Sequence, residues 1–403
     1  MNIGKRLSPA LRATLMLALL MPPVSCRDSS PRGLAPGNWN PVVHSVLDST
    51  IRTLGVLSEG YDSACPPYAV FDFDNTTIIG DISYATLVYS VENLSLRIAD
   101  PSFPHRILTA ALPDPEVPLQ GLEAMGSPSA SALALGIERK WSSLLSQKDR
   151  EGHSALSSDP MLRELLCEIW ALCLGVDNTY DPLTSCIWYA SLFSGFTPEE
   201  VRSLGKEAAS SALSVGAFHY ERVPYPPSGT TFDIPRGLAL TGEMKDLFAT
   251  LRDNGWECYI CSATLEQIVE GAACGDVLDL GGIDKDHVFG IRLAQDSEGV
   301  LLPYAMADYE EPYREGKTRC IKAHMAPSHC GRGPAIVAGD SGGDVSMLTS
   351  FPSTLSCGLL LDAGSGGAFE ELRSKALSSQ GPYVLQGRDA PGGKFVSRNP
   401  EIH

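Results

Sequence analysis

Two aspartates one residue apart follow an apolar run in the segment YAVFDFDNTT, residues 68–77. The run is typical of a fully buried parallel strand, so its end directs the carboxylates of Asp72 and Asp74 out of the strand. Carboxylates placed in this way serve proteins as nucleophiles, as general acids and bases, and as ligands of hard cations. Taken alone, the pattern also fits a solvated turn or a helix cap, so its meaning depends on further signals.

Further polar residues occur where other apolar runs end. Ser262 closes the run YICS, and Lys317 opens a helical stretch. The sequence GDSGGD then places Asp340 and Asp344 after the run AIVA. A lone serine or lysine means little, but ligands of open α/β sheets bind beyond the carboxyl ends of the strands. The ordered set therefore predicts one shared crevice that includes Asp72.

The elements that must position these residues alternate along the chain. Residues 38–57, before the first strand, have helical apolar spacing, and residues 83–229 have a predominantly helical pattern. The segment after Asp362 gives little signal. Short apolar runs that alternate with helices predict an α/β fold, a Rossmann-like parallel sheet with helices on both faces. The elements expected after residue 240 are helices at 241–255, 264–273, 316–325 and 343–351, strands at 256–263, 334–340 and 353–362, and a hairpin at 288–303.

The domain plan follows from the same pattern. We expect a first core segment at 27–82, an inserted helical domain at 83–229, and the rest of the core at 230–403. The proline-rich stretch YERVPYPPSG is taken as a connector at the edge of the insertion. A net charge of -17 over 403 residues argues against nucleic acid as a partner, because that binding needs an excess of Lys and Arg.

Residues 1–26 have the composition of a targeting segment, with basic residues before a short apolar stretch. A small residue before Cys26 resembles a bacterial lipobox, which predicts an exported protein that is periplasmic or attached to a membrane through lipidated Cys26. Ordinary cleavage by signal peptidase remains an alternative. Without Cys26, ten of the 11 cysteines remain, an even number that is compatible with disulfides. The predicted bridge joins Cys173 and Cys186.

The ordered motifs resemble those of the haloacid dehalogenase-like hydrolase superfamily. The resemblance covers roughly 68–82 and 230–362, and it implies a helical cap inserted after the first core strand. In that family, the residue matching Asp72 is the nucleophile and the residue matching Asp74 is the general acid and base. The family also implies Mg²⁺, held by Asp72, the main-chain carbonyl of Asp74, and Asp340.

The same resemblance assigns the remaining positions. Asn75, Ser262 and Lys317 would bind the substrate phosphate, and Thr76 and Asp344 would support the site. A carboxylate at the second motif position is typical of phosphatases and phosphomutases. Together with an export signal, it favours a phosphatase that acts on a small phosphomonoester. A phosphomutase, or an exported binding lipoprotein without turnover, is the alternative, and the oligomeric state is not predicted.

The expected cap resembles that of secreted bacterial phosphorylcholine phosphatases in the stretch that contains Trp188, Phe193 and Phe196. Most of its aromatic residues are expected to be core, although aromatic faces also bind quaternary ammonium groups. That family carries adjacent glutamates where this chain has Ser83 and Tyr84, with Asp81 nearby. The resemblance also implies a mobile cap with a flap at 76–83.

Overall fold

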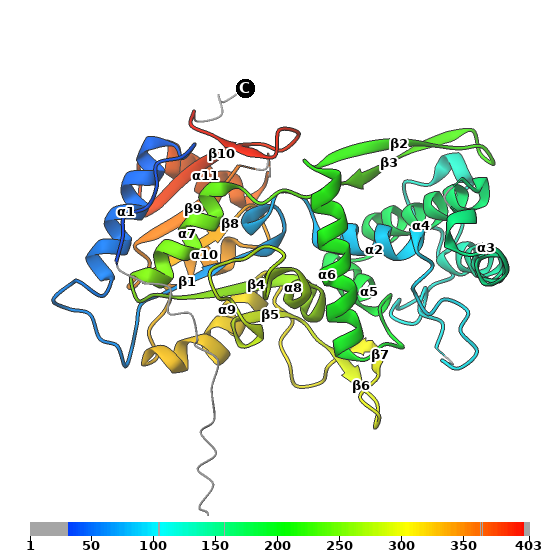
Figure 1. Ribbon diagram of the computed structural model, residues 1–403, viewed down its shortest axis with the longest axis horizontal. Coiled ribbons are helices and arrows are strands. Elements are labelled where there is room, and N and C mark those ends of the chain that lie inside the picture. Colours follow the sequence, from blue (N-terminus) through cyan, green and yellow to red (C-terminus); the bar gives the residue numbers. More distant parts are fainter. Residues whose placement is uncertain (1–30, 104, 157, 363, 365, 399–403) are drawn as a thin grey trace, which may run out of the picture. The chain divides into compact units, whose positions relative to one another are not determined.

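A seven-stranded sheet lies at the centre of the core, with the strand order β11-β10-β9-β8-β1-β4-β5 (Figure 1). This computed structural model describes residues 31–398 apart from 104, 157, 363 and 365. Neighbouring strands are parallel except for β10 and β11. The strands are β1 (Tyr68–Phe71), β4 (Glu257–Leu265), β5 (Val288–Ile291), β8 (Ile336–Gly339), β9 (Cys357–Leu361), β10 (Tyr383–Asp389) and β11 (Lys394–Val396).

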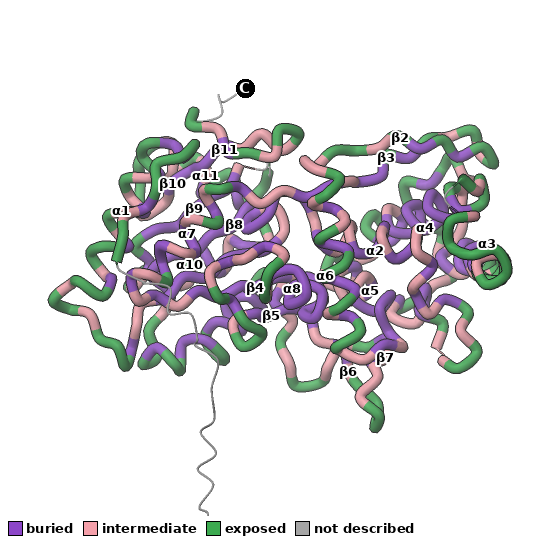
Figure 2. The backbone as a smooth tube through the Cα atoms, viewed as in Figure 1, coloured by how far each residue is buried: buried purple, intermediate pink, exposed green. Residues whose placement is uncertain are grey.

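Helices cover both faces of this sheet, which confirms the predicted α/β class. Side chains alternate along a strand, so Phe71 of β1 packs on Phe248 with ring centroids 4.5 Å apart, while Tyr68 joins a cluster on the other face. Strands β8 and β9 are buried throughout (Figure 2). The core helices are α1 (Pro41–Leu54), α7 (Gly242–Asp253), α8 (Glu266–Ala273), α9 (Glu315–Cys320), α10 (Val345–Thr349) and α11 (Ala368–Leu377).

A predominantly helical region follows β1, as the sequence predicts, and we call it the cap. Its segment rich in aromatic residues is mainly core: Trp188, Phe193 and Phe196 are all buried. None of the described helices combines the length and apolarity needed to cross a bilayer. The cap helices are α2 (Ile82–Glu92), α3 (Ala130–Glu151), α4 (Pro160–Thr179), α5 (Pro182–Ser191) and α6 (Pro198–Val215).

The expected connector YERVPYPPSG is instead one strand and the turn of a hairpin. β2 (His219–Tyr225) pairs in antiparallel fashion with β3 (Thr230–Arg236). Both strands contain a proline, Pro224 and Pro235, but each strand of a two-stranded hairpin has an unpaired edge where a missing N–H is tolerated. The prolines misled the sequence prediction because they were interpreted as strand breakers.

Two other segments also differ from expectation. The tail after Asp362 contributes α11, β10 and β11, so the sheet has two strands that the sequence did not predict. Within the predicted hairpin 288–303, β5 instead joins the main sheet, and the hairpin itself is β6 (Leu293–Gln295) with β7 (Leu301–Ala305). Leu301 also hydrogen-bonds through its main chain to Gly195 and Phe196 of the cap.

The predicted Cys173–Cys186 bridge is wrong, because both cysteines are free. Each lies inside a helix, α4 or α5, and not at the end of a loop that would bring the two together. The described residues form a different disulfide, between Cys65 and Cys330. The predicted targeting segment 1–26, with Cys26, lies outside the described residues.

Cap and core join most closely where α6 packs on α8. Glycines allow this approach: a Cβ at Gly271 would clash with the main-chain oxygen of Arg202, and one at Gly205 would lie 2.7 Å from that of Ile268. Arg202 Nε also donates to the buried carboxylate of Glu270 at 2.5 Å. This contact fixes the cap helix α6 against the core.

Candidate active site

Most of the predicted residues meet in one cavity of about 470 Å³ between the strand ends and the cap. Thr76 and Asp344 do not line it but hydrogen-bond to Asp72 and Lys317, which do. The strands β8, β1 and β4 are neighbours in the sheet, so the residues that follow or close them lie side by side. Asp72 follows β1, Asp340 follows β8, and Ser262 lies near the end of β4. Lys317 enters from α9.

Asp72 is held from several sides. Its backbone N–H donates to the carbonyl of Ala338 at 3.0 Å, which extends the strand pairing by one residue. Lys317 Nζ donates to Asp72 Oδ1 at 2.5 Å, and Thr76 Oγ1 donates to Asp72 Oδ2 at 3.2 Å. Thr77 Oγ1 donates to the carbonyl of Asp72 at 2.7 Å. These contacts fix the direction in which the carboxylate points.

Lys317 bridges two carboxylates at the base of the cavity. Besides Asp72 it donates to Asp344 Oδ1 at 2.7 Å, while Asp344 Oδ2 accepts the backbone N–H groups of Asp340 and Ser341. Burial alone would lower the pKa of Lys317, but the charges of Asp344 and Asp72 outweigh it and raise the pKa. The lysine therefore stays charged, and its charge is already shared between these partners.

Asp74 has a different environment from Asp72. Its Oδ1 accepts the backbone N–H of Ile82 at 2.6 Å, and its Oδ2 accepts Thr264 Oγ1 at 2.7 Å. Burial raises the pKa of Asp74 to about 8, and the charge of Asp81 adds to the rise. A carboxyl group with such a pKa can both donate and accept a proton near neutral pH.

The donor set also fits a hard divalent cation. Carboxylate oxygens of Asp72, Asp340 and Asp344 all lie within 4.8 Å of one another, and all three residues are buried. Burial raises the pKa of Asp72 to about 7 although the charge of Lys317 opposes the rise. Burial, followed by the charges of Asp344 and Asp72, also raises the pKa of Asp340. Closely spaced buried carboxylates of this kind are the ligands that Mg²⁺ prefers.

The predicted phosphate-binding residues also line the cavity. Asn75 has the left-handed φ of 59°, and its Oδ1 accepts the N–H of Gly80 at 3.3 Å. Ser262 is buried, and its Oγ accepts the N–H of Thr264 at 3.1 Å. Thr76, the predicted supporting residue, also donates to Asp340 Oδ1 at 3.3 Å.

Sequence reasoning missed two residues at this end of the cavity. Arg388 of β10 donates through Nη1 to the main-chain oxygen of Asn75 at 2.6 Å and to its Oδ1 at 3.2 Å. Thr264 holds Asp74, as described above. The available signal for Arg388 was the short run YVL, residues 383–385, which precedes it near the end of a strand.

The cap supplies the opposite wall of the cavity. Asp177 near the end of α4 accepts the hydroxyl of Tyr189 through Oδ2 at 2.9 Å. Asp81 caps the N-terminus of α2: its Oδ1 accepts the N–H of Tyr84 at 3.0 Å. The sequence singled out Tyr84 and Asp81, but not Asp177.

Fold and site together define an α/β protein of the Rossmann-like class with an acidic site at the strand ends. Residues 188–349 match the family model described as haloacid dehalogenase-like hydrolase. That match includes Ser262, Lys317 and Asp340, whereas Asp72 lies before it. Over this part of its length, which is less than half, the chain is similar to the haloacid dehalogenase-like hydrolases, an enzyme superfamily.

Two further proteins are similar to this chain. A phosphorylcholine phosphatase of Pseudomonas aeruginosa is 25% identical over 206 residues, which cover 51% of this chain and 43% of that protein. The chain thus matches less than half the length of this curated relative. A solved structure of a conserved protein of unknown function from Anaerococcus prevotii is 26% identical, with a TM-score of 0.79, and the match covers 91% of this chain and 97% of that one.

Proposed function

We propose that the protein is a magnesium-dependent phosphomonoesterase that forms an aspartyl-phosphate at Asp72. One observation carries the proposal: Lys317 joins the Asp72 and Asp344 carboxylates at 2.5 and 2.7 Å in the cavity that Asp74 and Asp340 also line. A buried carboxylate held in this way presents an oriented nucleophile, and an ammonium group beside it favours the ionised form.

In the first step, a carboxylate oxygen of Asp72 attacks phosphorus and the bond from phosphorus to the alcohol oxygen breaks. Asp74 gives its proton to the departing oxygen, a role that its raised pKa supports. In the second step, water attacks the phosphoryl group and the bond to Asp72 breaks. Asp74 takes the proton of that water, so the starting state returns and inorganic phosphate leaves.

Three side chains are placed to bind the phosphoryl oxygens. The amide oxygen of Asn75 already accepts hydrogen bonds from Gly80 and Arg388, which leaves its amide N–H groups as donors toward the cavity. Ser262 accepts a backbone N–H, so its hydroxyl hydrogen is available to the substrate. The charge of Lys317 offsets that of the transferred group.

Asp72 and Asp340 would hold the Mg²⁺ ion, together with the main-chain carbonyl of Asp74. Asp344 is committed to Lys317 and to two backbone N–H groups, which supports an orienting role. When bound, the ion would neutralise charge on the phosphoryl oxygens and on the acidic cluster. The single hydroxyl hydrogen of Thr76 is shared between Asp72 and Asp340, which links the two carboxylates.

The proposed substrate is a small phosphorylated metabolite, and the name of the Pseudomonas relative makes phosphocholine the first candidate. Aromatic side chains and carboxylates on the cap wall support a cationic alcohol. The positions of the family's glutamates give no support, because Ser83 hydrogen-bonds Thr264 at 3.0 Å and Tyr84 lies in the first turn of helix α2.

We also propose that the mature protein is exported and that Cys26 carries a lipid. Its support is the composition of residues 1–26 and the Cys65–Cys330 disulfide, since disulfides persist in oxidising compartments. Labelled fatty acid should enter the wild-type protein and not Cys26→Ala, with fractionation of the cells as a second readout. Equal labelling of both forms contradicts lipidation at Cys26.

Hydrolysis of p-nitrophenyl phosphate by the purified protein tests the activity. We expect turnover that stops when EDTA removes divalent ions and returns with added Mg²⁺. A panel of phosphocholine, phosphoethanolamine, glycerol phosphate, phosphoserine and nucleotides then ranks the candidate substrates. Absence of turnover with every ester in the presence of Mg²⁺ contradicts the proposed function.

A further inference from the structure

We propose that Asp81 and Asp177 bind a protonated amine on the alcohol part of the substrate, so that the enzyme selects phosphate esters of amino alcohols. This inference rests on the proposed function, because it places the phosphoryl group at Asp72 and the amine at the cap wall. It differs from the candidate suggested by the Pseudomonas relative in requiring N–H groups on the cation.

The charge of the cavity carries the inference. Among the described residues one basic side chain, Lys317, lines it, and Asp72 and Asp344 already share that charge. A divalent ion bound near Asp72 would offset negative charge at the phosphoryl end of the cavity and not at the cap wall. Two carboxylates of the cap wall are then left without a counter-charge, which favours a substrate that brings one. The acidic residues that line the cavity are Asp72, Asp74, Asp81, Asp177 and Asp340.

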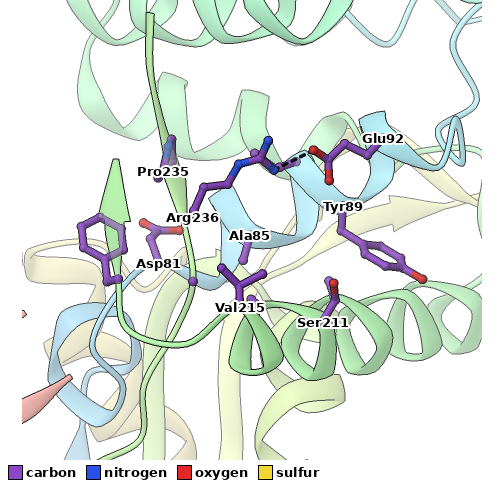
Figure 3. A pocket seen from close by; sticks show the side chains of 13 residues that line it. Asp81, Ala85, Tyr89, Glu92, Ser211, Val215, Pro235 and Arg236 are labelled. Atoms are coloured by element: carbon purple, nitrogen blue, oxygen red, sulfur yellow. Dashed lines mark ion pairs between the residues drawn. The ribbon is translucent and has the colours of Figure 1, made fainter. Parts of the chain in front are cut away.

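Asp81 has no cationic partner among the described residues. Arg236 comes from the neighbouring hairpin, but its guanidinium turns to Glu92 at 2.7 Å and to Glu221 at 2.9 Å, as Figure 3 shows for Glu92. Burial raises the pKa of Asp81 to about 6, and the charges of Asp72 and Asp177 add to the rise. A cation bound at this wall would relieve that repulsion.

Asp177 also has no cationic partner among the described residues. Asp177 is an exposed residue on the wall of the cavity. The Tyr189 hydroxyl occupies Oδ2, and a carboxylate retains further acceptor sites for an N–H donor. Asp177 therefore has both the charge and the free acceptor capacity that a protonated amine needs.

The aromatic residues of this wall favour an amine over a quaternary ammonium group. The Tyr84 ring packs edge-on against Trp170 at 5.1 Å and lies 5.5 Å from the Tyr189 ring. Tyr189 also packs against Trp188 at 5.1 Å. Because these rings pack on one another, they do not surround a cation on several sides, and carboxylate oxygens remain as the main acceptors.

The same charges act against substrates that carry a second anionic group. A carboxylate or second phosphate beside the ester would approach Asp81 and Asp177 with no cation to offset it. Like charges brought together in a partly desolvated site repel strongly. We therefore expect phosphoserine to be a poorer substrate than phosphoethanolamine, although both contain an amine.

The test compares phosphoethanolamine with n-propyl phosphate, in which a methyl group replaces the ammonium. We expect a kcat/KM ratio of at least about ten in favour of the amine in wild type, and a collapse of that ratio in Asp81→Asn and Asp177→Asn. Asparagine preserves the cap of α2 at position 81. Because each ratio compares two substrates of one variant, it cancels any general loss of activity.

Asp159→Asn is the matched control, since Asp159 caps α4 outside the cavity, and its ratio should equal that of wild type. Calorimetric binding of the same two esters to Asp72→Asn provides a readout that needs no turnover. Absence of all hydrolysis would contradict the proposed function, and the binding ratio would still decide the amine site. Equal ratios in wild type and both cap variants, or a preference for phosphocholine over phosphoethanolamine, would overturn the inference.

Discussion

The two ends of the cavity hold their acidic groups differently. At the core end Lys317 forms ion pairs with Asp72 and Asp344, whereas Asp74 accepts hydrogen bonds from Thr264 and Ile82. At the cap end, Asp81 and Asp177 face no basic side chain among the described residues. A preorganised end suits the phosphoryl transfer that every monoester shares, whereas uncompensated charge suits the choice of the alcohol.

This comparison predicts that core variants lose activity toward all esters alike. Replacing the nucleophile has the largest effect: Asp72→Asn should lower turnover by about 10⁴-fold or more, because no covalent route remains. Because the loss should be the same for cationic and neutral esters, one substrate, p-nitrophenyl phosphate, is enough to measure it. Retained turnover in a folded Asp72→Asn protein would remove the basis of the comparison.

Asp74→Asn should separate the two chemical steps. Without an acid, transfer from an alkyl ester should slow by about 10²- to 10⁴-fold, because the alkoxide must leave unprotonated. p-Nitrophenolate is a good leaving group, so its release in the first turnover should slow much less. Rapid mixing that resolves the first turnover measures both rates, and equal losses for the two esters would contradict the acid role.

The metal prediction tests the acidic cluster directly. Asp340→Asn should raise the Mg²⁺ concentration needed for half-maximal turnover by about 10- to 100-fold, the range for lost metal-site interactions. Mg²⁺ should also raise the melting temperature of the wild-type protein, because it binds the folded state, and should do so less in the variant. Asp159→Asn is again the control. Unaltered metal dependence would place the ion elsewhere.

The smallest effect is expected at the contact between helix α6 of the cap and helix α8 of the core. Gly271→Ala puts a methyl group against the Arg202 carbonyl and should cost about 1–3 kcal/mol of unfolding free energy. Gly136→Ala in α3 meets nothing within 4 Å and should instead stabilise the helix by up to about 1 kcal/mol. Chemical denaturation of both variants measures the difference. Equal stabilities of the two variants would mean that the α6–α8 contact accommodates the added methyl group, which would contradict this prediction.

The core end was predictable from the sequence because each candidate residue there follows a local signal. Asp72, Asp340 and Ser262 come after apolar runs, and parallel strands bring such ends together. The structure adds what spacing cannot give, such as the sharing of Lys317 between two carboxylates.

The cap end was less predictable. Asp177 lies inside a helix with no motif around it, and only the packing of α4 brings it to the cavity. Arg388 was missed because the tail after Asp362 was not recognised as part of the sheet. The Cys65–Cys330 disulfide joins residues 265 positions apart, a pairing that depends on the whole fold.

Acid quenching during turnover tests the central claim most directly, since an aspartyl-phosphate survives in acid long enough for peptide mapping. We predict a phosphoryl group on the peptide that contains Asp72, in larger amounts in Asp74→Asn, where hydrolysis of the intermediate lacks its base. A phosphoryl group on another residue, or turnover with none trapped in either protein, would contradict the account.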